Sequence, residues 1–320
     1  DRVPEEVIFL KGRTSASYEE THRLLRNLMT MGWYHRVKRR YPLKCLKRGH
    51  FTFGPARIRS GDLFGFFTRE TNLPQMDHLT VYPRIVPLEK LGIPSRQPLG
   101  DKRTRSDIFQ DPILTLGVRE YQPGDSLKRI HWKNTARSGK LLTRVFETTT
   151  TVDVAIFFDV RTVPPPLQGV VTKRLELGIV ATVSLANHAL AHGYRVGLYV
   201  NQNRWFTREP VRLPPSQNPD QLRQILETLA QVHPSATMPI NLVVQRESAG
   251  LAWGSTLVVI SASPTISIKT SLLKMKRAGR RVVLVIIGGE KTAEIPGLSV
   301  YHIGDDVNWS EMEQLSILSR

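Results

Sequence analysis

A charged segment at residues 118–147 holds the side chains of this sequence that are best suited to chemistry. It contains Glu120, Asp125, His131 and Lys133, which offer acids, a base and a cation to a hydrolase or nuclease. Their spacing matches no hydrolase motif. We therefore prefer two other hypotheses to catalysis. In the first, the segment is an ion-pair and capping network that fixes its own conformation; in the second, it is a docking surface for a partner.

The expected local structure of this segment follows from its turn residues. Pro123-Gly124 predicts a turn, after which Asp125 is expected to cap a helical turn that carries Leu127 and Ile130. If the segment is an ion-pair network, Trp132 would pack with these two apolar residues as its anchor.

Other motifs that carry chemistry are missing from the sequence. There is no phosphate-binding Gly-x-x-x-x-Gly-Lys-Ser/Thr, no dinucleotide Gly-x-Gly-x-x-Gly after a strand, and no Gly-x-Ser-x-Gly. His188 and His192 lie four residues apart but lack a third metal ligand. Cys45 is the single cysteine, which excludes a disulfide or a cysteine zinc site. We therefore expect no cofactor and no metal.

The net charge is +17 and is concentrated in the first half of the chain. Residues 1–150 hold 28 of the 45 Lys and Arg residues and 15 of the 28 Asp and Glu residues. Such an excess favours nucleic acid, anionic lipid head groups or an acidic protein as partner. A solvated strand surface explains it equally well.

The apolar pattern predicts four parts. Residues 1–90 are expected to form a mostly antiparallel β domain, with a strand at 7–10 and a short helix at 17–31 marked by a Ser17 and Glu20 capping box. Residues 91–112 are predicted to be a linker, and 113–150 a basic segment. Residues 151–320 are expected to be an α/β domain.

Strands and helices alternate in this last part. Apolar strands are predicted at 152–158, 195–200, 257–260, 282–287 and 300–303, and helices at 172–192, 220–232, 267–278 and 310–318. Strands that are apolar on both faces predict a parallel sheet covered by helices on both sides. Ligands of such sheets bind at the carboxyl ends of the strands.

The charged segment also resembles a known family signature. Arg119-Glu120-Tyr121, Pro123-Gly124-Asp125, Trp132-Lys133 and Gly139-Lys140-Leu141 are similar to the signature of the domain of unknown function 58 family. The upstream runs at 48–55 and 62–67 resemble the β-rich region that precedes it. The signature residues of this chain are Arg119, Glu120, Tyr121, Gly124, Asp125, Arg129, Trp132, Lys133, Arg137 and Lys140.

The resemblance implies a fold and partners that composition does not indicate. Its members carry two transmembrane helices near the N-terminus, then a β-rich domain, then a von Willebrand factor A-like, Rossmann-type domain. They occur beside MoxR-type AAA+ ATPases, and no enzymatic activity is assigned to them. We expect a cell-membrane-associated protein whose soluble part is cytoplasmic and whose anchor, absent from these residues, lies upstream of Asp1.

The resemblance also allows the metal site of that fold to be compared residue by residue. Von Willebrand factor A domains bind a divalent cation with Asp-x-Ser-x-Ser after the first strand. Here Asp159 occupies the first position, but Arg161 and Val163 replace the two serines. An arginine in a cation site would repel the ion. We expect a degenerate metal site in which Asp159 pairs with Arg161 or caps the following turn.

These observations together indicate a non-enzymatic assembly factor. It would work with a MoxR-type AAA+ ATPase, with anionic lipid head groups as a further partner. The alternative is a nucleic-acid-binding protein that uses the basic first half of the chain.

Overall fold

The computed structural model describes most of the chain in two compact units. The described residues are 2–4, 7–9, 13–16, 22–62, 64, 66–94, 109–123, 125, 127, 130–149, 153–164, 169–204, 207–252, 254–289 and 295–306. Residues 1–83 with 226–232 form the first unit, and residues 84–225 with 233–320 form the second.

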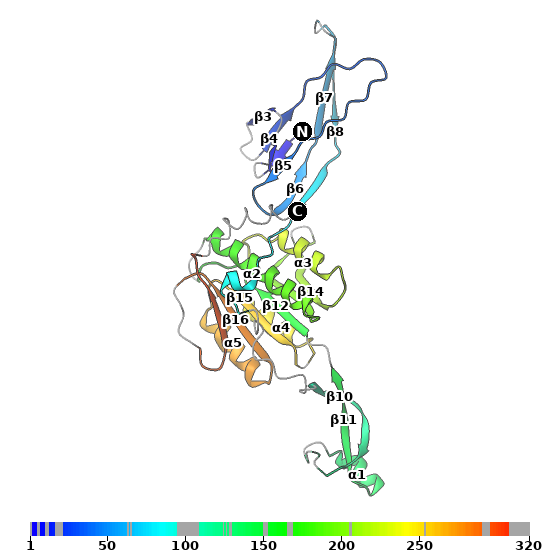
Figure 1. The fold of residues 1–320 in the computed structure, drawn as a ribbon, viewed down its shortest axis with the longest axis vertical. Coiled ribbons are helices and arrows are strands. Elements are labelled where there is room, and N and C mark those ends of the chain that lie inside the picture. Colours follow the sequence, from blue (N-terminus) through cyan, green and yellow to red (C-terminus); the bar gives the residue numbers. More distant parts are fainter. Residues whose placement is uncertain are drawn as a thin grey trace. The chain divides into compact units, whose positions relative to one another are not determined.

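The first unit is built from short antiparallel strands (Figure 1). Its strands are β1 (Arg2–Pro4), β2 (Val7–Phe9), β3 (Arg13–Ala16), β4 (His22–Arg26), β5 (Leu43–Cys45), β6 (Gly49–Phe53), β7 (Ala56–Gly61), β8 (Thr68–Leu73) and β9 (Asp77–Val81). They pair as one three-stranded sheet, β1-β4-β3, and as the pairs β2-β5, β6-β9 and β7-β8. Leu25 is buried in a small core against Tyr41, Cys45, Phe51 and Phe53. The predicted antiparallel β structure is therefore present, as several small sheets rather than one.

The helix predicted at 17–31 is wrong over the residues that can be judged. Residues 22–26 form β4, which pairs on both sides with β1 and β3, and the residues from 27 to 42 form no regular element. The pairing of β4 buries Leu25, so tertiary contacts outweigh the helical spacing of its leucines. The proposed capping residues Ser17 and Glu20 lie outside the described residues.

The second unit contains a six-stranded sheet of order β14-β13-β12-β15-β16-β17. Its strands are β12 (Asp153–Phe158), β13 (Arg195–Asn203), β14 (Pro210–Ser216), β15 (Thr256–Ser261), β16 (Arg281–Ile287) and β17 (Ser299–Ile303). All neighbours pair in parallel except the edge strand β14, which is antiparallel to β13. The strands β12, β15 and β16 are buried on both faces, as predicted for a covered parallel sheet.

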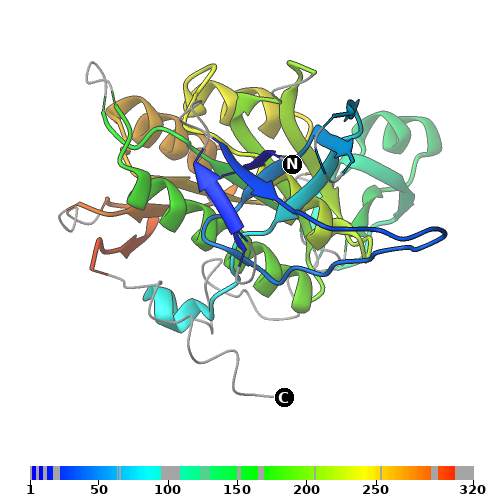
Figure 2. The ribbon, with the colours of Figure 1, turned by 90° about the horizontal axis from the view of Figure 1, so that it is seen from above.

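Helices cover both faces of this sheet (Figure 1, Figure 2). The helices are α2 (Thr172–Ala191), α3 (Gln221–Ala230), α4 (Ile240–Ser248) and α5 (Ile266–Arg277), and a short 3-10 helix, η1, spans Leu88–Leu91. Ala155 and Phe157 of β12 share one core cluster with α4 and α5. On the other face Phe158 meets α2 at Gly178, where a Cβ would lie 2.7 Å from the Phe158 ring. That glycine sets the close approach of α2 to the sheet.

Most elements of this unit agree with the sequence predictions. The predicted helices 172–192, 220–232 and 267–278 correspond to α2, α3 and α5. The strand β14 and the helix α4 were not predicted, and the predicted helix 310–318 lies outside the described residues. Within the part of the chain that the structure describes, no helix is long and apolar enough to cross a bilayer.

Candidate functional site

Residues 109–149 form a hairpin with a small helix in its connection, here termed the signature module. Its elements are β10 (Phe109–Glu120), α1 (Trp132–Ser138) and β11 (Leu142–Thr149). The strands pair in antiparallel register, with Glu120 opposite Leu142. β10 begins inside the linker predicted at 91–112, because its pairing with β11 extends as far as Phe109 opposite Thr149.

Two ion pairs hold the connection of the module. The Arg119 guanidinium donates to both carboxylate oxygens of Asp125, at 2.8 and 2.7 Å. The ammonium of Lys140 donates to Glu120 Oε1 at 2.7 Å. The hydrogen bond with Asp125 raises the pKa of Arg119, and the bond from Lys140 lowers the pKa of Glu120 and raises that of Lys140. Both acids of this connection are thus neutralised by bases within it.

The α-helix of the module begins at Trp132. The Asp125 carboxylate accepts the Gln122 N–H at 3.0 Å and so closes a turn. The helical turn predicted after Asp125 lies mostly outside the described residues, of which Leu127 is in a 3-10 conformation and accepts the Ile130 N–H at 3.2 Å. The N-cap is His131, whose Nδ1 accepts the Asn134 N–H, and the helix ends at Gly139 with φ 70°.

The predicted apolar anchor is only partly correct. Ile130 is 4% exposed and bridges to Thr143, but Trp132 is 66% and Leu127 67% exposed. Lys133 and Arg137 lie four residues apart on α1 and are both exposed. The outer surface of the module therefore combines apolar side chains with cations.

A second cluster lies where ligands of parallel sheets bind, at the carboxyl ends of β12, β13 and β15. This carboxyl-edge cluster consists of Asp159, Asn201 and Ser261, all buried. Asp159 accepts three hydrogen bonds: Asn201 Nδ2 at 2.7 Å, Ser261 Oγ at 2.9 Å, and the Arg161 N–H at 3.1 Å. Burial nevertheless raises the pKa of Asp159.

The cluster confirms one expectation for Asp159, which caps the turn that follows β12 through the Arg161 N–H. A small pocket of about 20 Å³ beside it is lined by Asp159, Arg161, Asn241, Ser263 and Thr265, among others. Of the three possible cation ligands here, only Asp159 is a carboxylate, and its oxygens already accept protein donors. Among the described residues, no three His, Cys, Asp or Glu side chains gather as a metal set.

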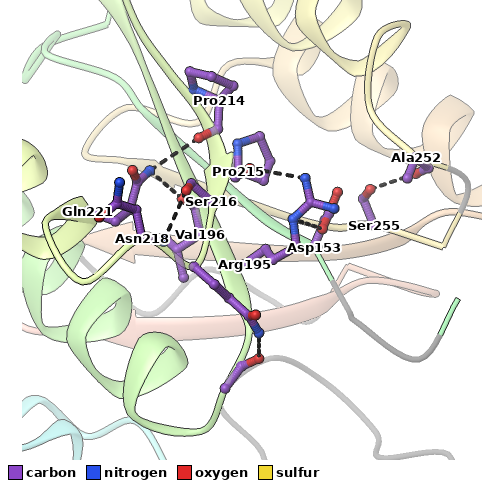
Figure 3. Close-up of polar contacts among 12 residues, drawn as sticks. Asp153, Arg195, Val196, Pro214, Pro215, Ser216, Asn218, Gln221, Ala252 and Ser255 are labelled. Atoms are coloured by element: carbon purple, nitrogen blue, oxygen red, sulfur yellow. Dashed lines mark hydrogen bonds and ion pairs between the residues drawn. The ribbon is translucent and has the colours of Figure 1, made fainter.

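The opposite, amino edge of the sheet carries a different acid (Figure 3). Asp153 begins β12 and lies 3.4 Å from Arg195 Nε, while Arg195 Nη2 donates to the Pro215 carbonyl. Gln221 donates to the carbonyls of Val196 and Pro214. Burial raises the pKa of Asp153, partly offset by Arg195. These contacts tie the edge strand β14 to β13, which is a structural role.

Comparison with known proteins agrees with the resemblance of the charged segment. A family model described as "Protein of unknown function DUF58" matches residues 117–316. The chain belongs to the DUF58 family. An "Uncharacterized protein YeaD" of Bacillus subtilis (strain 168) is 26% identical over 296 residues, which cover 92% of this chain and 68% of that protein. The DUF58 match begins within β10 and covers both the signature module and the sheet.

The structure brings some of the predicted signature residues of this DUF58 chain together. Arg119 meets Asp125, and Glu120 meets Lys140. The Tyr121 N–H donates to the Leu141 carbonyl. Trp132, Lys133 and Arg137 share α1 with outward positions, and Gly124 and Arg129 lie outside the described residues.

Asn201 and Ser261 were not singled out from the sequence. Each stands directly after a predicted strand, at 195–200 and 257–260. Polar residues at the ends of neighbouring parallel strands meet at one edge of the sheet. Their positions directly after predicted strands could therefore have indicated that they lie beside Asp159.

Proposed function

We propose that this DUF58 chain is a non-enzymatic interaction factor that binds an acidic surface of a partner through its signature module. The carrying observation is the charge balance of the module. Two of its acids, Glu120 and Asp125, are held in internal ion pairs, whereas no ion pair is found for Lys133, Arg137 or Arg144 in the described residues. Exposed Trp132, next to Lys133 on α1, adds a side-chain type that dominates binding at protein interfaces.

In this proposal the α/β unit is a von Willebrand factor A-like module whose metal site is degenerate. Support comes from its strand order, which places β12 in the middle with β13 and β14 on one side and the last three strands on the other. Asp159 stands after the central strand β12, but its oxygens are taken by Asn201, Ser261 and the backbone of Arg161. A buried acid saturated in this way is suited to support the sheet edge rather than to bind a cation or activate water.

The proposed partner is a MoxR-type AAA+ ATPase, and the full-length protein is proposed to be membrane-anchored. Both expectations rest on the family resemblance of residues 119–141. The basic, partly apolar surface of the module supports an acidic partner but does not by itself identify one.

The test is direct binding of the purified chain to a purified MoxR-type ATPase, measured by biolayer interferometry. We expect Lys133→Glu with Arg137→Glu to weaken binding by at least about tenfold, because two attractive charges become repulsive. The matched control is Lys274→Glu with Arg277→Glu, which reverses two exposed charges on another helix, α5. Equal affinity of both double variants would overturn the docking role of the module.

A second candidate function is nucleic-acid binding, which one specific observation favours. Residues 36–40 hold four cations in a row of five, Arg36, Lys38, Arg39 and Arg40, and all of them are exposed. Phosphate contacts by such cations would make affinity fall steeply as salt rises. A fluorescence-anisotropy titration with a labelled duplex tests this, and no binding at about 50 mM salt would exclude it.

A further inference from the structure

Figure 1 shows the hairpin β7–β8 in the first unit. Three exposed phenylalanines, Phe64, Phe66 and Phe67, lie between its strands and are here termed the aromatic tip. Phe64, Phe66 and Phe67 are 82%, 79% and 80% exposed. The rings of Phe64 and Phe66 lie with their centroids 6.1 Å apart. Three exposed rings within four residues form an apolar feature of the kind that marks a contact site.

The hairpin that carries the tip has no core of its own. β7 and β8 form a two-stranded sheet, and every residue of the pair except Ala56 is exposed. A two-stranded hairpin exposed on both faces is marginally stable in water. Burial of the end of the hairpin in an apolar environment would stabilise the hairpin.

The backbone of the tip is closed on itself. The Asp62 carboxylate accepts the N–H groups of Phe67, at 2.7 Å, and Phe64, at 3.3 Å. The Asp62 N–H donates to the Phe67 carbonyl at 3.1 Å. At Gly61 a Cβ would lie 2.7 Å from that carbonyl, so glycine is needed for the turn to close. Internal pairing of this kind lowers the cost of placing a turn in a phase poor in water.

Polarity changes along the hairpin, and its two faces also differ: exposed Ile58 and Leu73 lie on one face, and Arg57 and Arg59 lie on the other. The strands carry Arg57, Arg59 and Arg69, and the end carries the three rings. Arg57 pairs with Glu70 at 3.1 Å, while no ion pair is found for Arg59 or Arg69 among the described residues. Arg59 precedes the strand end at Gly61 by two residues, or about 7 Å.

Arg59 and Arg69 lie on opposite faces of the hairpin, because Arg69 is opposite Ser60 and Glu70 is opposite Arg59. A bilayer can contact cations on both faces at one depth, whereas a protein surface packed on one face would contact only one of them. In the interfacial region, aromatic rings enter the acyl boundary while arginines stay with the phosphates. Residues 1–83, which belong to the same unit as the hairpin, hold 15 Lys and Arg and 8 Asp and Glu, and this basic excess adds attraction to anionic lipid. We propose that the aromatic tip inserts Phe64, Phe66 and Phe67 into the interface of an anionic lipid bilayer, with Arg59 and Arg69 at the level of the head groups. This inference does not depend on the partner proposed for the signature module.

The first test is co-sedimentation of the whole chain with vesicles of phosphatidylcholine containing about 30% phosphatidylglycerol. The variant combines Phe64→Ser, Phe66→Ser and Phe67→Ser. The control combines Leu242→Ser and Ile266→Ser, which remove two exposed apolar side chains (49% and 82% exposed) from the other unit. We expect the tip variant to bind vesicles at least about tenfold more weakly, with the control unchanged.

The second test reports depth and does not depend on the stability of the triple variant. The single native cysteine allows Cys45→Ser to be combined with Phe66→Cys, which then carries an environment-sensitive fluorophore. Vesicles are expected to shift its emission to the blue, whereas a label at Ile266→Cys in the same background is expected not to shift. Vesicle binding that the tip variant retains in full, or a label at position 66 that stays in water on vesicles, would overturn the proposal.

Discussion

The carboxyl edge of the sheet and the signature module treat their acidic residues in opposite ways. Asp159 is buried, and neutral donors from Asn201 and Ser261 satisfy it. Glu120 and Asp125 lie at the surface and are paired with cations. At the edge where many parallel sheets bind ligands, the protein's own side chains here satisfy the buried acid. In the module, by contrast, cations and the Trp132 ring are exposed to solvent. We therefore expect the edge to govern stability and the module to govern binding.

The largest expected effect follows from removing the buried acid. Asp159→Ala leaves the Ser261 hydroxyl, one donor of Asn201 and the Arg161 N–H without their acceptor. Unpaired buried donors are costly, so we expect a loss of about 2–4 kcal/mol in the free energy of unfolding. Urea unfolding measures it, with Asp220→Ala, an exposed acid paired with Arg223, as control. Equal urea midpoints for the two variants would show that Asp159 does not stabilise the fold more than an exposed acid does.

The next effect concerns the module and should appear in binding alone. Trp132→Ala truncates a side chain that is 66% exposed, so the free energy of unfolding should change by less than about 0.5 kcal/mol. Aromatic residues at the centre of an interface contribute strongly, so affinity for the ATPase should fall at least about tenfold. Paired urea and interferometry measurements separate the two quantities. A large loss of stability with unchanged affinity would make Trp132 a structural residue.

The sequence predicted the elements whose residues are buried along their whole length. It did not predict those whose conformation depends on pairing with a strand far away in the sequence. The strands β12, β15 and β16 are apolar throughout, and α2 has a long apolar face closed by Gly193, so their patterns were unambiguous. The strand β14 contains Pro210, Pro214 and Pro215, which argue against a strand. Only its position at the sheet edge, beside β13, allows it.

The candidate site was predictable to a similar degree. The types of residues in the signature predicted ion pairs, but not which acid meets which base. Arg119 reaches Asp125, six residues away, because the intervening chain turns back, and Lys140 reaches Glu120 across the hairpin. The capping role predicted for Asp125 stays a prediction, because most of the turn that follows it lies outside the described residues.

A smaller effect is expected at Asp305, which joins the start of α2 to the loop after β16. Its carboxylate accepts two hydrogen bonds from Arg174 and one from the Gly289 N–H. The bonds from Arg174 lower the pKa of Asp305 from 3.8 to about 2. The side chain is 42% exposed, so after allowance for solvent screening we expect Asp305→Asn to cost about 1 kcal/mol.

The pH dependence distinguishes this effect from a change in packing. Because the folded pKa lies below the unfolded one, the contribution of Asp305 is complete above about pH 4 and is lost as pH falls toward 2. The difference in thermal midpoint between wild type and Asp305→Asn should therefore shrink over that window. A difference that stays constant down to pH 2 would exclude the ion pair as its source.

The smallest expected effect is that of a divalent cation. A cation with a dissociation constant of about 100 μM, added at about 10 mM, would stabilise the fold by about 2.7 kcal/mol. We expect no shift of the thermal midpoint with Mg²⁺ or Mn²⁺, because Asp159 already accepts three protein donors. Arg161→Ser sharpens the comparison, since it removes the nearby positive charge and leaves those hydrogen bonds intact. A midpoint that rises with Mg²⁺ in this variant alone would make charge repulsion by Arg161 the barrier to the ion, and a rise in wild type would show that the edge is open.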